Sequence, residues 1–170
     1  MKKVLLVSFA LLLCAILCRA QVQSGAYRVM LRKLLSHSVP EIQVQDLMRD
    51  SSAAAGILFL DAREPKEFQV SHLNGALPVG YDQFTLDNLP DTLAKDQRIV
   101  VYCSVGYRSE KVAEKLIAAG FTNVQNLYGG IFEWVNQGNT VYDAQGATPR
   151  VHAFDRTWGV WLRKGKKIFN

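Results

Sequence analysis

The sequence predicts an α/β fold with a central, mostly parallel β-sheet flanked by helices. Short apolar runs of strand length alternate with segments of helical spacing along the middle of the chain, which is the pattern of such folds. The run at 57–60 is continuously apolar, as expected for a strand buried on both faces of a parallel sheet. With 170 residues, 49% of them hydrophobic, and only 12 Gly and 5 Pro, a disordered or collagen-like chain is excluded.

Residues 1–20 are expected to be a secretory signal peptide. A pair of lysines precedes an apolar run at 4–17, which is shorter than the roughly 20 residues that span a bilayer, and a cleavage-site pattern ends at Ala20. An uncleaved anchor is the alternative, and a lipoprotein is disfavoured because leucine precedes each leader cysteine. Such a signal peptide would direct export of the protein. Its cleavage after Ala20 would remove two of the three cysteines and leave Cys103.

The expected elements after the leader follow one another in a regular order. A helix at 27–35 within the N-terminal segment 21–40 ends before Pro40. The longest helix, at 109–119, has one apolar face and stops at Gly120. The other expected elements are a short strand and helix in 42–50, a small-residue linker at 51–56, strands at 57–60, 75–79, 98–102 and 124–127, and short helices at 64–70, 82–89 and 131–136.

Residues 139–170 form a basic, aromatic C-terminal extension. Apolar residues at 160–162 and 168–169 flank Gly165, and this pattern predicts a hairpin packed on the domain. Arg and Lys residues are interleaved with Trp and Phe in the last part of the extension, so contact with a protein partner or an anionic lipid surface is the alternative role. Nucleic acid is not expected to be a partner of an exported chain.

Cys103 is expected where a buried strand ends and a loop leads into the longest helix. Ligands of open α/β sheets bind beyond the carboxyl ends of the strands, and free N–H groups at a helix start favour an anion. The loop consists of Ser104, Val105, Gly106, Tyr107 and Arg108. Gly106 can adopt a positive φ, and Arg108 adds positive charge near the sulfur. The pattern predicts a nucleophilic thiolate, with a buried structural cysteine as the alternative.

Four segments in register resemble the rhodanese sulfurtransferase family over residues 41–138. They are Cys103-Ser104-Val105-Gly106-Tyr107-Arg108-Ser109, Leu60-Asp61-Ala62-Arg63-Glu64-Pro65-Lys66-Glu67-Phe68, Ser71-His72-Leu73-Asn74-Gly75-Ala76 and Tyr128-Gly129-Gly130-Ile131-Phe132-Glu133-Trp134. The resemblance implies a rhodanese-like domain in which Cys103 takes a sulfane sulfur from a donor such as thiosulfate, as a persulfide, and passes it to cyanide or a thiol. Together with the leader, it implies a location in the bacterial periplasm or cell envelope.

Loop length separates this chemistry from two related ones. In the resembling families, sulfurtransferases have six residues from Cys to Arg, whereas dual-specificity phosphatases and arsenate reductases have seven. The chain has six, from Cys103 to Arg108, which favours sulfur transfer. A non-catalytic sulfur carrier or partner-binding module with the same fold is the main alternative. No cofactor or metal is expected, because no cluster of His, Cys and Asp has metal-ligand spacing and no glycine-rich phosphate motif is present.

Residues after the first strong strand have two interpretations. Asp61 and Arg63 are expected to border the pocket near the loop, or Arg63 forms an internal ion pair, for example with Glu67. His72 is expected to be a hydrogen-bonded turn residue and not a general base. Trp134 is expected to pack in the core or the pocket wall.

Overall fold

The computed structural model describes residues 25–49 and 56–169. The expected signal peptide and nearly all of the expected linker lie outside the described residues. The chain divides into two units after Leu34, and the described part of the first unit is a helix over residues 25–34, as the helical spacing predicts. In the part of the chain that the structure describes, no helix is long and apolar enough to cross a membrane.

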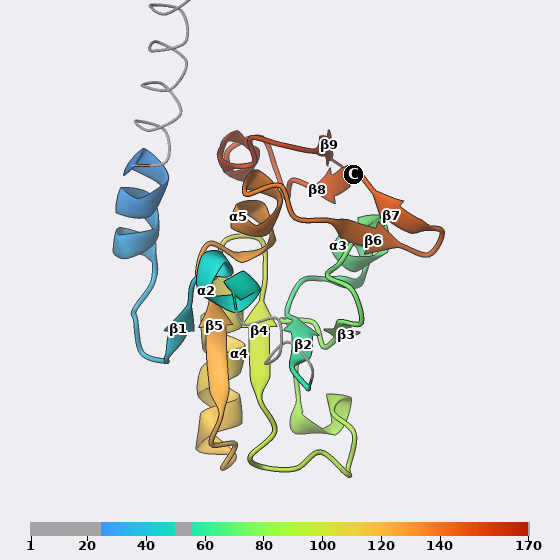
Figure 1. Ribbon diagram of the computed structural model, residues 1–170. Coiled ribbons are helices and arrows are strands. Elements are labelled where there is room, and N and C mark those ends of the chain that lie inside the picture. The colour runs from blue at the N-terminus through green and yellow to red at the C-terminus, as the bar shows by residue number, and fades with distance from the viewer. Residues whose placement is uncertain (1–24, 50–55, 170) are drawn as a thin grey trace, which may run out of the picture. The chain divides into compact units, whose positions relative to one another are not determined.

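The second unit is built on a five-stranded parallel sheet (Figure 1). In spatial order its strands are β1 (Glu41–Ile42), β5 (Val124–Leu127), β4 (Ile99–Tyr102), β2 (Leu58–Asp61) and β3 (Leu77–Pro78). All neighbours pair in parallel, and every residue of the central strand β4 is buried. The predicted parallel sheet is therefore confirmed, and β4 is the strand that leads to Cys103.

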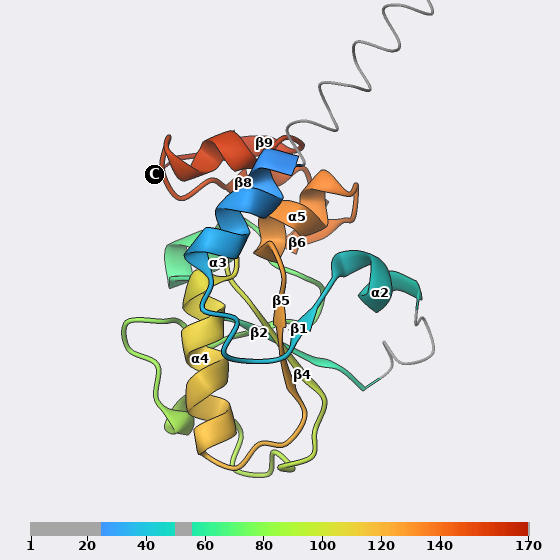
Figure 2. The same cartoon turned by 90° about the vertical axis from the view of Figure 1, so that its left-hand side faces the viewer.

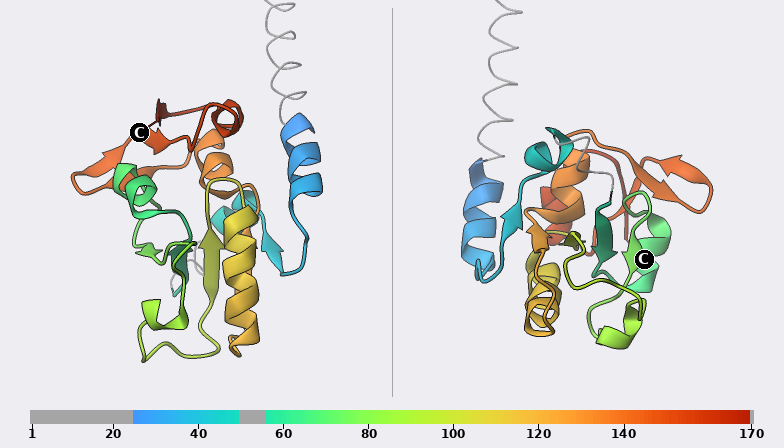
Figure 3. Two further views of the ribbon diagram at one scale, coloured as in Figure 1. Left: turned by 180° about the vertical axis from the view of Figure 1, so that it is seen from behind. Right: turned by 60° about the horizontal axis from the view of Figure 1, so that its bottom comes forward.

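Helices surround this sheet. They are α2 (Val44–Arg49), α3 (Pro65–Val70), α4 (Tyr107–Ala118), α5 (Gly130–Asn136) and the 3-10 helix η1 (Leu86–Asn88). Figure 2 shows α4 on one face and α2 on the other, and the view from behind in Figure 3 shows α4 alongside β4. Val112 and Leu116 of α4 are buried in one core cluster with Ile99 and Val101 of β4, so the apolar face of the helix lies on the central strand.

Two expected helices differ in extent from the observed ones. Helix α4 begins at Tyr107 and not at Ser109, because Gly106 already turns the chain with a φ of 115°. The expected helix at 82–89 is reduced to the three residues of η1. Its buried apolar anchors, Phe84 and Leu89, are five residues apart, and this spacing does not give a helix one apolar face.

The C-terminal extension has a different topology from the expected one. Its elements are β6 (Val141–Asp143), β7 (Gly146–Thr148), β8 (Arg150–His152), the 3-10 helix η2 (Trp158–Trp161) and β9 (Lys166–Ile168). Strands β6 and β7 form a hairpin, so the extension does contain one. A hairpin over 160–169 is wrong, however, because β9 pairs in parallel with β8, and η2 lies in the crossover that parallel pairing requires.

Candidate active site

Cys103 lies directly after the central strand, at the edge of the core. Only 1% of the residue is exposed, and it belongs to the same core cluster as Ile99 and Val101, because alternate residues of a strand point to one face. The backbone N–H of Gly106 donates a hydrogen bond to Cys103 Sγ over 3.1 Å. A donor aimed at the sulfur stabilises a negative charge on it.

Gly106 shapes the loop that carries this donor. It is the N-cap of α4, with φ 115° and ψ −14°, a left-handed conformation that glycine adopts without steric cost. The loop therefore folds back over the sulfur and enters a helix of 12 residues at once. The first N–H groups of that helix have no intrahelical acceptor and carry its positive dipole end, which favours an anion at the loop.

The start of α5 holds the other side of the loop by backbone contacts. The N–H groups of Ile131 and Phe132 donate to the carbonyl oxygens of Cys103 and Ser104 over 2.9 and 3.1 Å. Gly130 has a φ of +56°, and a Cβ at this position would lie 2.3 Å from the Cys103 oxygen. The close backbone approach thus requires glycine at position 130, the second glycine of the closing segment.

The substitution Gly130→Ala is expected to destabilise the protein by about 1–3 kcal/mol more than Gly75→Ala, because overpacking adds to the backbone strain. Gly75 is the matched control, since it has a φ of +69° but no atom near the site of an added Cβ. Urea unfolding of both variants measures the difference. Equal losses would mean that the clash at Gly130 relaxes freely.

Asn126 is a positioning residue that the sequence reasoning missed. Its Nδ2 donates to the Gly106 carbonyl over 3.0 Å, and its Oδ1 accepts from Ser109 Oγ over 2.7 Å. The side chain is fully buried in β5. The available signal was an asparagine at an inward-facing position of a strand expected in the central sheet, because buried polar groups are kept only where they are hydrogen-bonded.

Arg108 closes the loop through a partly buried ion pair with α3. Its Nη1 and Nη2 donate to the two carboxylate oxygens of Glu67 over 2.7 and 2.8 Å, and Nη2 also lies 3.1 Å from Ser104 Oγ. Ser104 Oγ in turn donates to Glu67 over 3.2 Å. A bidentate pair of this kind fixes orientation as well as distance. Glu67 was expected to pair with Arg63, and its actual partner lies 41 residues further along the chain.

Burial disfavours the charged forms of Glu67 and Arg108, but the interaction between the two side chains outweighs this effect. Burial favours the neutral carboxyl of Glu67, yet the hydrogen bonds and positive charge of Arg108 lower the pKa of Glu67 below its ordinary value of 4.5. Burial likewise opposes the Arg108 cation, and the hydrogen bonds to Glu67 together with the charge of the Cys103 sulfur raise the pKa of Arg108. Both groups are therefore held in their charged forms behind the loop.

A fall in pH is expected to lower the free energy of unfolding through protonation of Glu67. Since its pKa is lower in the folded state, its stabilising contribution is complete above about pH 4.5 and is lost as the pH falls through the folded pKa. Glu67→Gln should lower the free energy of unfolding at neutral pH by about 1.5–3 kcal/mol and flatten its acid dependence. Glu114→Gln is the control, because Glu114 pairs with Lys111 at the surface. An unchanged acid dependence in Glu67→Gln would contradict the assignment.

Asp61 and Arg63 pair with each other inside the protein and line neither of the two pockets described below. Both side chains are fully buried, and Arg63 Nη2 lies 2.6 Å from Asp61 Oδ2 and from the Ser71 carbonyl oxygen. The expected internal ion pair exists, but its partner is Asp61 and not Glu67. The reason is that Arg63 precedes α3 and turns back on the strand end, where Asp61 also accepts its backbone N–H over 3.0 Å.

His72 and Trp134 have structural contacts. His72 Nδ1 lies 3.1 Å from the Phe68 carbonyl oxygen, and its ring stacks on that of Phe68 at 3.9 Å. Trp134 Nε1 donates to the Thr140 carbonyl over 2.8 Å, and its ring meets Phe59 edge-on. His72 is thus held against the end of α3, and Trp134 joins α5 to β2 and to the segment that precedes β6.

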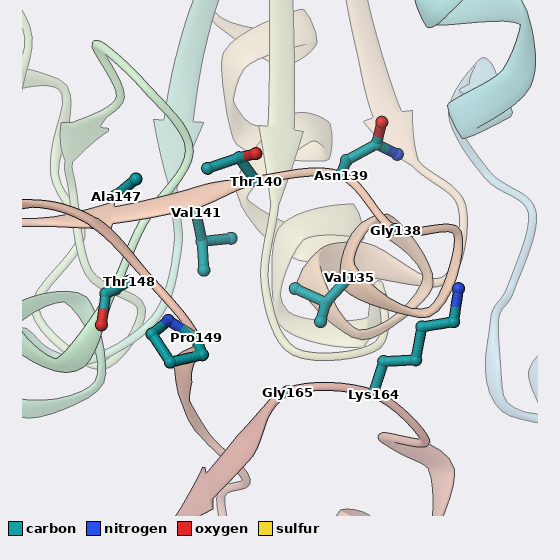
Figure 4. A pocket seen from close by; sticks show the side chains of 10 residues that line it. All are labelled: Val135, Gly138, Asn139, Thr140, Val141, Ala147, Thr148, Pro149, Lys164 and Gly165. Atoms are coloured by element: carbon teal, nitrogen blue, oxygen red, sulfur yellow. The ribbon is translucent and has the colours of Figure 1, made fainter.

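Two surface pockets lie away from the loop. The larger, of about 430 Å³, lies between α5, the β6–β7 hairpin and the turn at Lys164 (Figure 4). Val135 and Val141 point into it, and Lys164 lies at its rim. The second, of about 400 Å³, is formed by residues near the start of β2 and in 90–97. The loop 103–108 lines neither of these pockets. Among the described residues, no group of His, Cys, Asp and Glu could hold a metal ion.

Comparisons with curated proteins give matches to parts of much longer chains. The chain is 37% identical over 98 residues to the tRNA uridine(34) hydroxylase of Hamiltonella defensa, covering 55% of this chain and 26% of that protein. It is 35% identical over 83 residues to the adenylyltransferase and sulfurtransferase UBA4 of Candida albicans, covering 45% and 19%. The chain thus spans about a quarter or less of the length of these curated relatives.

Solved structures and a family model agree on the domain. A rhodanese-related protein from Thermoplasma volcanium is 26% identical with a TM-score of 0.51, covering 60% of this chain and 96% of that chain. The thiosulfate sulfurtransferase of Pseudomonas aeruginosa, at 22% identity and a TM-score of 0.56 over 73% of this chain and 23% of that chain, shares the fold. Residues 43–137 match the model of the rhodanese-like domain. With more than half of its residues matched, the chain belongs to the rhodanese-like domain family.

Proposed function

We propose that the protein is a sulfurtransferase that carries a sulfane sulfur on Cys103. The observation that carries the proposal is a free cysteine at the end of the central strand, with the Gly106 N–H 3.1 Å from its sulfur. The family supports it, as do the relatives whose names include sulfurtransferase. An activated thiolate next to fixed donors is the arrangement that covalent catalysis requires.

The proposed reaction has two balanced halves. The Cys103 thiolate attacks the outer sulfur of a donor such as thiosulfate, a new S–S bond forms as the old one breaks, and sulfite leaves with the bonding electron pair. The terminal sulfur of the resulting persulfide is then attacked by cyanide or a thiolate, which leaves with that sulfur and regenerates the Cys103 thiolate. Such a sequence gives ping-pong kinetics.

Phosphate chemistry is disfavoured by the same loop. It has six residues from Cys103 to Arg108, and the Arg108 guanidinium is bound by Glu67 through both of its terminal nitrogens. A phosphate or arsenate would have to compete with that carboxylate for the arginine. A non-catalytic carrier or binding module would keep the fold, but it would not need a backbone N–H group that donates a hydrogen bond to the sulfur.

The place of action is part of the proposal. The leader at 1–20 supports export to the periplasm or cell envelope, with cleavage after Ala20. In that oxidising compartment an exposed thiol is readily oxidised. The burial of Cys103 to 1% exposure would limit this damage.

Intact-mass analysis tests the function directly. After exposure of the protein to thiosulfate, we expect a mass gain of one sulfur atom that a reductant or cyanide removes. The Cys103→Ser variant should show no gain. If the wild-type protein gains no sulfur from thiosulfate or from an organic thiosulfonate, the binding-module alternative replaces the sulfurtransferase.

A further inference from the structure

Phe154 brings an aromatic ring from the C-terminal extension to the loop that carries Cys103. The centre of its ring lies 5.1 Å from the guanidinium carbon of Arg108, the last residue of the loop. A guanidinium over an aromatic face is attracted by the ring. Nevertheless, 46% of Phe154 is exposed, so Arg108 leaves part of this residue open to solvent.

The backbone at Phe154 is held in a costly conformation. Its φ is 65°, a left-handed value that is rare for a bulky residue and persists only where the surroundings impose it. The buried His152 accepts the Phe154 N–H through Nδ1 over 3.1 Å. On the other side, Asp155 accepts the Trp158 N–H over 2.8 Å and starts η2. Strained residues of this kind cluster at functional sites.

The charge of the loop also favours an apolar donor over a small dianionic one. Arg108 is the one cation in 104–108, and Glu67 engages it through both carboxylate oxygens. A small dianionic donor would therefore find backbone N–H groups but a guanidinium that is already neutralised. The half-exposed ring instead offers apolar contact to whatever approaches the loop.

On these grounds, and resting on the sulfur transfer proposed above, we propose that Phe154 is a specificity-determining residue of the Cys103 site. It selects sulfur donors and acceptors that carry an apolar, above all aromatic, group next to the reacting sulfur. The reaction with such a donor is balanced as before. The Cys103 thiolate takes the terminal sulfur of an organic thiosulfonate, and the sulfinate leaves with the electron pair of the broken S–S bond.

Benzenethiosulfonate and methanethiosulfonate provide a matched test, because both carry one negative charge and the same reacting sulfur. The measured quantity is the ratio of their kcat/KM values with cyanide as acceptor, followed as thiocyanate. In Phe154→Ala and Phe154→Gly this ratio should fall about 2- to 10-fold below the wild-type ratio, the range of aromatic contacts. Phe154→Gly removes the ring without backbone strain, so the result does not depend on how the alanine variant folds.

Two further variants complete the test. Phe154→Tyr keeps the ring and should keep the ratio. Phe169→Ala removes another exposed ring of the extension, one that packs on Gly159, and should leave the ratio unchanged. If an active enzyme has the same ratio with and without the Phe154 ring, the selectivity is overturned and sulfur transfer stands. If the wild-type protein forms no persulfide with either donor, sulfur transfer is overturned and the selectivity with it.

Discussion

Replacing Cys103 with serine is expected to abolish sulfur transfer while leaving the fold intact. The hydroxyl of serine would accept the Gly106 N–H that the sulfur now accepts, so the loop keeps its shape. Serine cannot form a persulfide, however, because it has no sulfur atom to bond to the sulfur of the donor. Turnover of thiosulfate and cyanide should therefore fall at least about a thousandfold, as expected for the loss of a covalent nucleophile.

Two measurements make this expectation specific. Cys103→Ala should lose activity to the same extent, because it also lacks the thiolate. Both variants should unfold cooperatively in urea, which separates loss of chemistry from loss of structure. Comparable turnover in the serine variant and the wild-type protein would remove Cys103 from the mechanism.

The substitution Asp61→Ala is expected to cost about 3–5 kcal/mol of unfolding free energy, because it leaves a buried charge without its partner. Arg63 is fully buried and makes its ion pair with Asp61, and its raised pKa shows that burial, which disfavours the cation, is outweighed by that carboxylate. The guanidinium stays charged at any pH at which the protein folds. Urea unfolding at neutral pH measures the loss.

A double substitution separates the cost of leaving one buried charge unpaired from the net contribution of the intact pair to stability. Replacing both partners, as Asp61→Leu with Arg63→Met, should recover most of the stability, since apolar groups of similar size avoid the desolvation penalty. Asp46→Ala serves as the control, because Asp46 and Arg49 form an exposed pair worth about 0.5 kcal/mol or less. A loss in Asp61→Ala as small as that of the control would show that the buried pair contributes little.

Local patterns were sufficient to predict the sheet and the position of Cys103 between a buried strand and a helix. The apolar runs at 57–60 and 98–102, and the helix that follows Cys103, are encoded within a few residues each, and the structure places them as expected. The loop boundary differed because a single positive φ at Gly106 starts the helix early. The sequence shows that Gly106 can adopt a positive φ, but the spacing of apolar residues does not show that the helix begins directly after it.

Apart from the local pair of Arg63 with Asp61, the missed contacts join distant segments. Glu67 and Arg108 are brought together only because α3 and α4 both start at the carboxyl edge of the same sheet. Asn126 reaches Gly106 from the neighbouring strand. The extension was misread for the same reason. The alternation around Gly165 fits a local hairpin, whereas the actual partner of β9 is β8, with η2 between them.

The short outer strands of the sheet have a consequence for behaviour in concentrated solution. Strands β1 and β3, the two edges, have only two residues each, and β3 contains Pro78, which lacks a backbone N–H. Another chain that tried to extend the sheet would find too few free peptide groups to form a ladder. The edges of this five-stranded sheet, as the structure describes them, thus offer a poor template for fibril growth.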